Sequence, residues 1–226
     1  MDFSGNQAIN SIGIQTSNKL LVGTLSGDIF RTSDFGITWD GWEAAVPSTG
    51  ITSFLKTNEG KLLVGTDGKG VYYLKADESG WMEISKGLSN QIVTSLTQHT
   101  NGNIFASTFG GGLFVSTNEG TSWETTGQKT GQLRKVAVTK DGLLYIVENN
   151  VGILSSTDFG ISWSRILTAP VRGLFISKHG YVFTSLGYTD TTSSIYFSKN
   201  NGVSWVKSNT QTITSVISSF AEDSLG

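Results

Sequence analysis

The residues best suited to recognition chemistry are two arginines in matching sequence contexts. Only four arginines occur in the 226 residues, and two of them lie in similar runs, Leu133-Arg134-Lys135-Val136 and Val171-Arg172-Gly173-Leu174. A guanidinium group offers parallel N–H donors, so a pair of arginines could bind a carboxylate or sulfate by bidentate hydrogen bonds. Arg134 and Arg172 are therefore candidate ligand-binding residues.

Both arginines also have structural explanations, which the sequence leaves open. Glu148 is expected on the strand antiparallel to that of Arg134 and at the same end, so a local Arg134–Glu148 pair would need no ligand. Arg172 adjoins an expanded loop that carries Tyr188 and Asp190, and it could pair with Asp190. Long loops on rigid scaffolds often carry function, and tyrosine adds a flat apolar face with a polar tip. The candidate site is accordingly Arg134, Arg172, Glu148, Tyr188 and Asp190.

Several other chemistries lack the residues they need. The chain has no cysteine, which excludes disulfides, thiolate metal ligands and a cysteine nucleophile. The two histidines, His99 and His179, fall in expected turns at the opposite end from the arginines and are interpreted as solvated, with no metal-ligand spacing and no role in a serine triad. No metal or cofactor is expected. A net charge of -2 without a basic stripe argues against nucleic acid, and no stretch approaches the roughly 18 apolar residues of a membrane span.

The elements that would position these residues come from an internal repeat. Tryptophans recur at intervals of 40 to 42 residues, at Trp39, Trp81, Trp123, Trp163 and Trp205. Each repeat contains three short aliphatic runs separated by polar or glycine-rich turns, and its tryptophan begins a fourth run. No segment of ten or more residues has helical periodicity. Four strands of about six residues with short turns fill such a unit, which predicts an all-β propeller of four-stranded antiparallel blades.

The repeat also predicts the domain organisation. One domain over residues 1–226 is expected, with five complete blades and the first strand of a sixth. The expected blades cover about 9–42, 51–84, 93–126, 133–166 and 171–208, and the extra inner strand covers about 213–220. Two arrangements remain open: a piece of a six- to eight-bladed propeller, which is favoured, or a five-bladed ring that tolerates a surplus strand. An open strand edge invites pairing, so self-association through the terminal blades is expected.

The turn before four of the five repeat tryptophans follows the pattern Ser/Thr-x-Asp-x-Gly-x-Ser/Thr-Trp or its asparagine version, as in Ser33-Asp34-Phe35-Gly36-Ile37-Thr38-Trp39, and the unit before Trp81 keeps only a remnant of it. This pattern resembles the Asp-box, or BNR repeat, of sialidases, xyloglucanases, sortilin-type receptors and photosystem II assembly factors. A structural role is expected, with the acidic or amide side chain accepting turn hydrogen bonds, the glycine at positive φ and the tryptophan packed between sheets. A repeated metal site is the alternative, and Asn118 and Asn200 at the aspartate position argue against it. The structural set is Asp34, Gly36, Trp39, Trp81, Gly120, Trp123, Asp158, Gly160, Trp163, Gly202 and Trp205.

The resemblance carries little information about function, because these families perform unrelated tasks. A sialidase would need an arginine triad, and Arg31 and Arg165 are expected on strands away from the channel. Residues 87–96 and 101–108 are similar to periplasmic sensor propellers of bacterial two-component regulators and to exported Bacteroidetes repeat proteins. A noncatalytic, extracellular or periplasmic binding or scaffolding module is therefore predicted, with a carbohydrate or peptide at the channel face. The alternative is a glycoside hydrolase of the sialidase-like class, with Glu148 and Asp190 as its carboxyl pair.

Overall fold

The computed structural model describes residues 8–16, 18–42, 46, 49–189, 192–208, 213–215, 217 and 219–222. Twenty strands and no helix occur in this described part, which confirms the all-β prediction. A helix capable of crossing a membrane is accordingly not found among these residues. Consecutive strands pair in antiparallel fashion within each four-stranded unit, which is a meander. Pairing of Phe109 and Gly110 with Gln132 and Gly131 also joins the third and fourth units into one eight-stranded sheet.

Five such units, here called blades 1 to 5, follow one another along the chain. Blade 1 contains β1 (Ile9–Thr16), β2 (Lys19–Thr24), β3 (Ile29–Thr32) and β4 (Asp40–Gly41). Blade 2 contains β5 (Ile51–Lys56), β6 (Leu62–Thr66), β7 (Val71–Leu74) and β8 (Trp81–Glu83). Blade 3 contains β9 (Val93–Gln98), β10 (Ile104–Gly110), β11 (Gly112–Ser116) and β12 (Glu124–Thr125). Blade 4 contains β13 (Gly131–Val138), β14 (Leu144–Glu148), β15 (Gly152–Ser156) and β16 (Ser164–Leu167). Blade 5 contains β17 (Val171–Ile176), β18 (Val182–Thr189), β19 (Thr192–Ser198) and β20 (Val206–Lys207).

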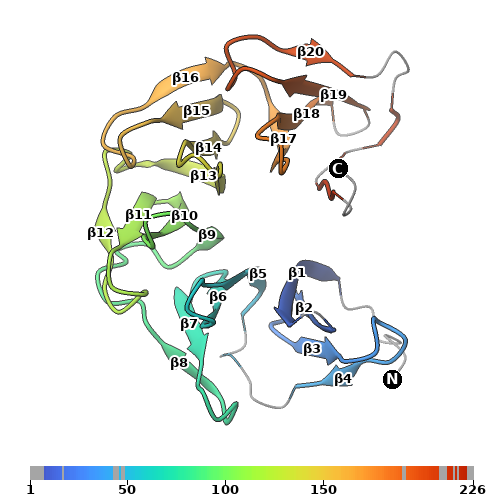
Figure 1. The fold of residues 1–226 in the computed structure, drawn as a ribbon, viewed down its shortest axis with the longest axis vertical. Coiled ribbons are helices and arrows are strands. Elements are labelled where there is room, and N and C mark those ends of the chain that lie inside the picture. The colour runs from blue at the N-terminus through green and yellow to red at the C-terminus, as the bar shows by residue number, and fades with distance from the viewer. Residues whose placement is uncertain are drawn as a thin grey trace.

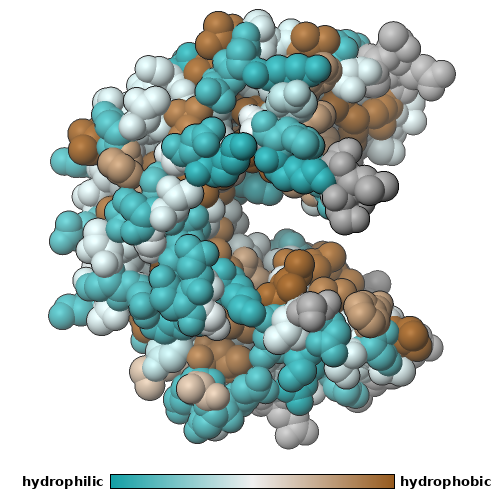
Figure 2. Space-filling view, viewed as in Figure 1, coloured by the Kyte–Doolittle hydropathy of each residue, from teal (hydrophilic) through white to brown (hydrophobic). Residues whose placement is uncertain are grey.

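The blades are arranged around an arc, with the inner strands β1, β5, β9, β13 and β17 toward its centre (Figure 1). The arc does not close, because a gap separates blade 1 from blade 5. The space-filling view shows the same opening (Figure 2). A closed five-bladed ring, the second arrangement that the sequence left open, is therefore not what the structure contains.

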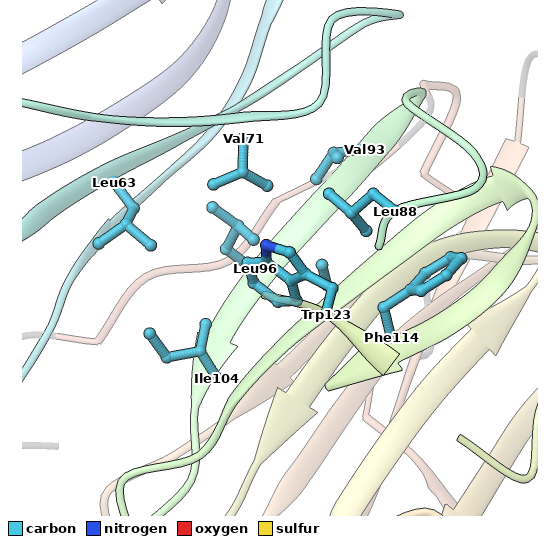
Figure 3. Close-up of a cluster of buried hydrophobic side chains, with 9 residues drawn as sticks. Leu63, Val71, Leu88, Val93, Leu96, Ile104, Phe114 and Trp123 are labelled. Carbon is cyan, nitrogen blue, oxygen red and sulfur yellow. The ribbon is translucent and has the colours of Figure 1, made fainter. Parts of the chain in front are cut away.

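Apolar side chains between neighbouring blades form the core. One cluster joins Leu63 and Val71 of blade 2 to Val93, Phe114 and the buried Trp123 of blade 3 (Figure 3). Similar clusters contain residues of blades 1 and 2, of blades 3 and 4, and of blades 4 and 5. Each blade is thus stabilised largely by burying one face against its neighbour, as expected for stacked sheets whose inner faces are apolar.

The turn after each inner strand is held by a buried side chain at its start. The hydroxyls of Thr57, Thr139 and Ser177 accept the N–H of the residue four positions later, at 3.0 to 3.1 Å. In blade 3 this position is His99, whose Nδ1 accepts the N–H of Asn101 at 3.1 Å. The same turn position therefore tolerates any buried acceptor.

The two histidines, both predicted to be solvated, differ in the structure. His179 is exposed, whereas His99 is buried, with 4% of its surface exposed. Because Nδ1 accepts a hydrogen bond, Nε2 carries the proton and donates to the carbonyl oxygen of Gly142 at 2.9 Å. The prediction is wrong for His99 because its partner belongs to the next blade, which a reading of the local sequence does not reveal.

The segment after blade 5 also differs from its prediction as a sixth inner strand. In its described residues 213–215, 217 and 219–222 no strand is formed, and Ile213 makes an isolated bridge with Ser193. The N–H of Ser193 donates to the Ile213 carbonyl at 2.9 Å, and the N–H of Lys178 donates to Glu222 Oε2 at 2.8 Å. The segment thus lies along blade 5. A strand requires several consecutive backbone pairings with a neighbour. The described residues of this segment make one such pairing, the bridge between Ile213 and Ser193.

Candidate ligand-binding face

A β-bulge occurs at the same aligned position of every inner strand, which is the second residue of β1, β5, β9 and β17 and the fourth residue of β13. The ladder pairs Leu133 with Glu148 and then Lys135 with Val147, so Arg134 has no partner on β14. The same register shift occurs at this position in the other four blades. A bulge redirects its side chain and is common beside functional sites. We call these five residues the bulge ring: Asn10, Thr52, Thr94, Arg134 and Arg172.

Two small members of the bulge ring join neighbouring blades. The amide of Asn10 donates to the Ile51 carbonyl at 2.9 Å, and the hydroxyl of Thr94 donates to the Leu133 carbonyl at 2.9 Å. Each acceptor lies on the inner strand of the blade that follows, directly before the bulge residue of that strand, and the two acceptors are Ile51 of β5 and Leu133 of β13. Asn10 and Thr94 therefore have a structural use, whereas the buried hydroxyl of Thr52 has no hydrogen-bond partner among the described residues and the longer arginines at this position call for another explanation.

Arg134 is exposed and its Nε donates to Asn149 Oδ1 at 2.7 Å. Asn149 is itself oriented by a hydrogen bond from its Nδ2 to Gln132 Oε1 at 3.0 Å. Among the described residues the one ion pair is between Arg31 and Glu78, at 3.3 Å. The suggested Arg134–Glu148 pair is therefore wrong. Glu148 lies opposite Leu133 instead, and the guanidinium of Arg134 lacks a neutralising carboxylate in this described set.

Arg172 is half-buried on β17, at the bulge position of the adjacent blade. Asp190 and the side chain of Tyr188 lie outside the described residues, so the Arg172–Asp190 pair stays a prediction. The backbone differs from the expected loop, because β18 continues to Thr189 and β19 begins at Thr192, with these two residues paired. The run of threonine and serine in this segment has high enough strand propensity to extend the hairpin. The structure thus brings Arg134 and Arg172 to equivalent places on adjacent inner strands.

Lys135 is a further cation that the sequence analysis did not single out. It directly follows the bulge residue, at the position where Ser11 and Ser95 donate hydroxyl hydrogen bonds to the next blade at 3.0 and 3.4 Å. Lys135 is half-buried, and this burial lowers the pKa of its ammonium group. Aligning the repeats would have revealed it, because a lysine replaces the serine of blades 1 to 3. Its burial distinguishes it from Arg134, the exposed cation that precedes it on β13.

The turn before Trp39, Trp123, Trp163 and Trp205, here called the clasp turn, satisfies its own polar groups. Asp34 accepts the N–H of Thr38 at 2.9 Å and the hydroxyl of Thr32 at 2.7 Å, and Gly36 has a φ of 91°. Hydrogen bonds from the N–H and hydroxyl of Thr38, with that from Thr32, lower the pKa of Asp34 to about 2. Asn118 accepts the Ser122 N–H at 2.9 Å in the same geometry. The described residues contain no cluster of three or more acidic or histidine groups that could hold a metal.

A cavity of about 440 Å³ lies at the opposite end of the blades and was not foreseen from the sequence. Its lining includes Lys61, whose Nζ lies 4.4 Å from the ring centroid of Tyr73 and donates to the Glu119 carbonyl at 3.1 Å. Glu78, also in the lining, pairs with Arg31. Lys61 and Glu78 thus have protein partners, a backbone carbonyl and an aromatic ring for Lys61 and Arg31 for Glu78. It is therefore a weaker candidate site than the bulge ring.

Comparisons with known proteins support the architecture. A family model described as the DUF6242 beta propeller domain matches residues 47–175, which is more than half of the chain. The structure of YCF48 bound to D1 peptide is similar, with 17% identity and a TM-score of 0.67, over 92% of this chain and 69% of that chain. No curated protein matches this sequence.

Two further solved structures have the same arrangement of blades. The extracellular domain of the hybrid two-component system BT4673 from B. thetaiotaomicron is 15% identical, with a TM-score of 0.69 over 83% of this chain and 27% of that chain. Virginiamycin B lyase from Staphylococcus aureus is 12% identical, with a TM-score of 0.74 over 91% of this chain and 71% of that chain. At these identities the likeness shows the fold alone.

Proposed function

The chain belongs to the DUF6242 β-propeller domain family, and from this premise we propose that it is a noncatalytic binding module that recognises a peptide or carbohydrate. Its site is the channel face of blades 4 and 5, around Arg134 and Arg172. The observation that carries this proposal is the pair of arginines at bulges of adjacent inner strands, where other blades place small polar residues. The absence of an Arg134–Glu148 ion pair supports it further.

An acidic peptide is the ligand class that this site favours. Arg134 is exposed, is oriented through Asn149, and has no carboxylate partner in the described structure. The half-buried Lys135 on the same strand adds a second positive charge. Charge-assisted hydrogen bonds from a guanidinium to a carboxylate are short and about twice as strong as neutral ones. YCF48, a structural neighbour, has been solved with a D1 peptide bound, which supports a peptide rather than a free sugar here.

We further propose that the protein acts outside the cytoplasm. The Asp-box-like repeat and the phrases at 87–96 and 101–108 are similar to those of exported and periplasmic sensor propellers. The neighbouring structure from B. thetaiotaomicron is an extracellular domain, and this likeness supports the same placement. An external propeller that binds an acidic peptide would serve as a receptor or scaffold.

Binding of fluorescent peptides tests the proposal. Peptides carrying aspartate or glutamate should bind, and their amide counterparts with asparagine or glutamine should bind about tenfold more weakly, because one charge-assisted interaction is worth roughly 1.5 to 3 kcal/mol. Arg134→Ala should cause a similar loss. Arg165→Ala is the matched control, because Arg165 is an exposed arginine on the outer strand β16. Equal binding by both variants, or a ligand that maps to the cavity beside Tyr73, would contradict this site.

A carbohydrate ligand would give a different result in the same assay. Neutral glycans bound with the same affinity by the wild type and by Arg134→Ala would indicate recognition by stacking rather than by charge. Added salt also separates the two ligands, since exposed charge interactions weaken as the ionic strength rises. A salt-insensitive glycan complex would therefore replace the acidic peptide in this proposal.

A further inference from the structure

The cavity beside Tyr73, of about 440 Å³ and here called the blade 2 cavity, forms where the repeat loses its clasp turn. When the repeats are aligned on their tryptophans, Leu74 takes the position of Thr32. Ala76 takes that of Asp34, which in blade 1 accepts the Thr32 hydroxyl at 2.7 Å. Leu74 and Ala76 both line the cavity. Blade 2 thus lacks the stabilising hydrogen bonds of a clasp turn at the same place where it forms the cavity.

Three consecutive blades contribute to the wall of the blade 2 cavity. Gln15 comes from β1, Tyr73 from β7 and Glu119 from the clasp turn of blade 3. The Nε2 of Gln15 donates to Glu78 Oε1 at 3.0 Å, so a hydrogen bond joins the parts of the wall that belong to blades 1 and 2. The volume lies within the roughly 300 to 1,000 Å³ of small-molecule sites. The cavity can therefore hold a small ligand.

The blade 2 cavity carries equal numbers of positive and negative groups. The charged residues in its lining are Lys56, Lys61, Lys75, Glu59, Glu78 and Glu119. This balance sets the cavity apart from the bulge ring, whose charged members are both arginines. Because recognition requires complementary charges, a balanced set favours a ligand that carries one charge of each sign over a simple anion or cation.

Protein groups already engage four of these six charges. Lys61 and Glu78 have the partners described above. The ammonium of Lys56 donates to a backbone carbonyl at 2.7 Å. Glu59 accepts a hydrogen bond from the side-chain amide of Gln98 at 3.2 Å, which is the main cause that lowers the pKa of Glu59. These four charged groups are therefore held by the protein itself.

Lys75 and Glu119 are the two remaining charges. Within the described residues, neither side chain makes a hydrogen bond or an ion pair. The ammonium of Lys75 contributes to the lowered pKa of the nearby Asp77, after the larger effect of hydrogen bonds from Ser79. Lys75 is half-buried in the turn of blade 2, and Glu119 is exposed in the clasp turn of blade 3. A half-buried ammonium group without an acceptor is stabilised when a ligand supplies one.

We propose that the blade 2 cavity binds a free α-amino acid, with the ligand carboxylate on Lys75 and the ligand ammonium on Glu119. Each of these two protein charges then meets the opposite charge of the zwitterion, and hydrogen bonds between charged groups are the strong ones. Leu62 and Tyr73 also line the cavity and provide apolar surface for the ligand side chain. An apolar or aromatic amino acid is therefore favoured. This site and its ligand are separate from the channel face and its acidic peptide.

Thermal shift and isothermal titration calorimetry with free amino acids test the ligand class. L-leucine or L-phenylalanine at about 10 mM should raise the melting temperature, because a ligand that binds the folded state stabilises it. The N-acetyl derivative lacks the cation and the carboxamide lacks the anion, so each should bind about tenfold more weakly. If no standard amino acid raised the melting temperature, or if either derivative bound as tightly as its parent, the proposal would be overturned.

Paired variants test the two contacts. Lys75→Met and Glu119→Gln should each weaken amino acid binding about tenfold, whereas Lys75→Arg keeps the charge and should retain binding. Lys69→Met and Glu124→Gln are the matched controls. Lys69 is exposed in the turn between β6 and β7, at the opposite end of blade 2, and Glu124 is exposed on β12. Equal affinities of the test variants and their controls would overturn the proposal.

A comparison with Arg134→Ala separates this site from the proposed function. Arg134→Ala should weaken binding of the acidic peptide and leave the amino acid affinity unchanged. Lys75→Met should show the opposite pattern. Loss of both ligands in either variant would indicate one shared site and would overturn the proposal of a second one.

Discussion

The imidazole of His99 joins two blades, because its Nε2 donates a hydrogen bond to the carbonyl oxygen of Gly142 at 2.9 Å. The ring also lies 5.0 Å from the ring of Phe159, in the clasp turn of blade 4. One buried side chain thereby holds the first turn of blade 3 against two turns of blade 4. Contacts of this kind between turns determine how consecutive blades are oriented.

Replacement of His99 should destabilise the protein strongly. His99→Ala removes the acceptor of the Asn101 N–H and leaves the Gly142 carbonyl without its partner in a buried site. The expected loss is about 2 to 4 kcal/mol of the free energy of unfolding, from the cavity and the unsatisfied groups together. Chemical denaturation measures it. His179→Ala is the control, since His179 is exposed, and an equal loss in both variants would contradict the role assigned to His99.

Acid should lower the stability of the folded protein, because it protonates the aspartates of two clasp turns. The pKa values of Asp34 and Asp158 are both lowered from 3.8 to about 2, mainly by hydrogen bonds from Thr38 and from Ser162, respectively. A carboxylate with a lowered folded-state pKa contributes stability that is present above its ordinary pKa and is lost as the pH falls from about 4 toward 2. The melting temperature of the wild type should therefore fall across this window.

A double variant isolates the contribution of these two carboxylates. Asn118 and Asn200 already make the same turn with neutral amides, so Asp34→Asn with Asp158→Asn should fold normally. Its melting temperature should depend less steeply on pH between about 4 and 2, because neither side chain titrates. If the melting temperature of the double variant depended on pH as steeply as that of the wild type, other titrating groups would control acid unfolding.

Gly127 should tolerate no side chain. A Cβ atom placed there would lie 1.9 Å from the carbonyl oxygen of Ile161 in the next blade, and backbone cannot move aside as a flexible side chain can. Gly127→Ala should lower the free energy of unfolding by about 1 to 3 kcal/mol, in the range measured for overpacking. Gly41→Ala serves as the control, because its Cβ would approach only the Phe30 ring, at 3.7 Å. Equal stability of the two variants would show that the blades can separate at little cost.

Replacement of Trp123 should destabilise the protein more than replacement of Trp163, although both tryptophans follow a clasp turn. The indole N–H of Trp123 donates to the Ile84 carbonyl of blade 2 at 2.7 Å, whereas that of Trp163 donates to Gly160 in its own turn at 3.1 Å. Trp123→Phe should reduce stability by about 1 to 3 kcal/mol, because it leaves a carbonyl unsatisfied between two blades. Trp163→Phe should have the smaller effect. The reverse order in denaturant titrations would argue against the inter-blade hydrogen bond.

Local features were predictable from the sequence, and relations between blades were not. The strands and the polar turns follow from alternation and from turn residues such as Asn101-Gly102, which act over a few positions. The burial of His99 depends on Gly142, and the gap depends on the angle between blades, so neither has a local signal. Alignment of the repeats placed Arg134 and Arg172 at equivalent positions. It could not show that Arg134 contacts Asn149 rather than Glu148, because that choice depends on side-chain geometry.

The bulges place the proposed ligand-binding residues outside the ladders that hold each sheet together. A bulge residue has no partner in the ladder, so its replacement leaves the pairing of β13 with β14, or of β17 with β18, intact. Arg134 and Arg172 can therefore be exchanged during evolution with little effect on folding. A library randomised at positions 52, 134 and 172 would be a direct route to new binders on an unchanged scaffold.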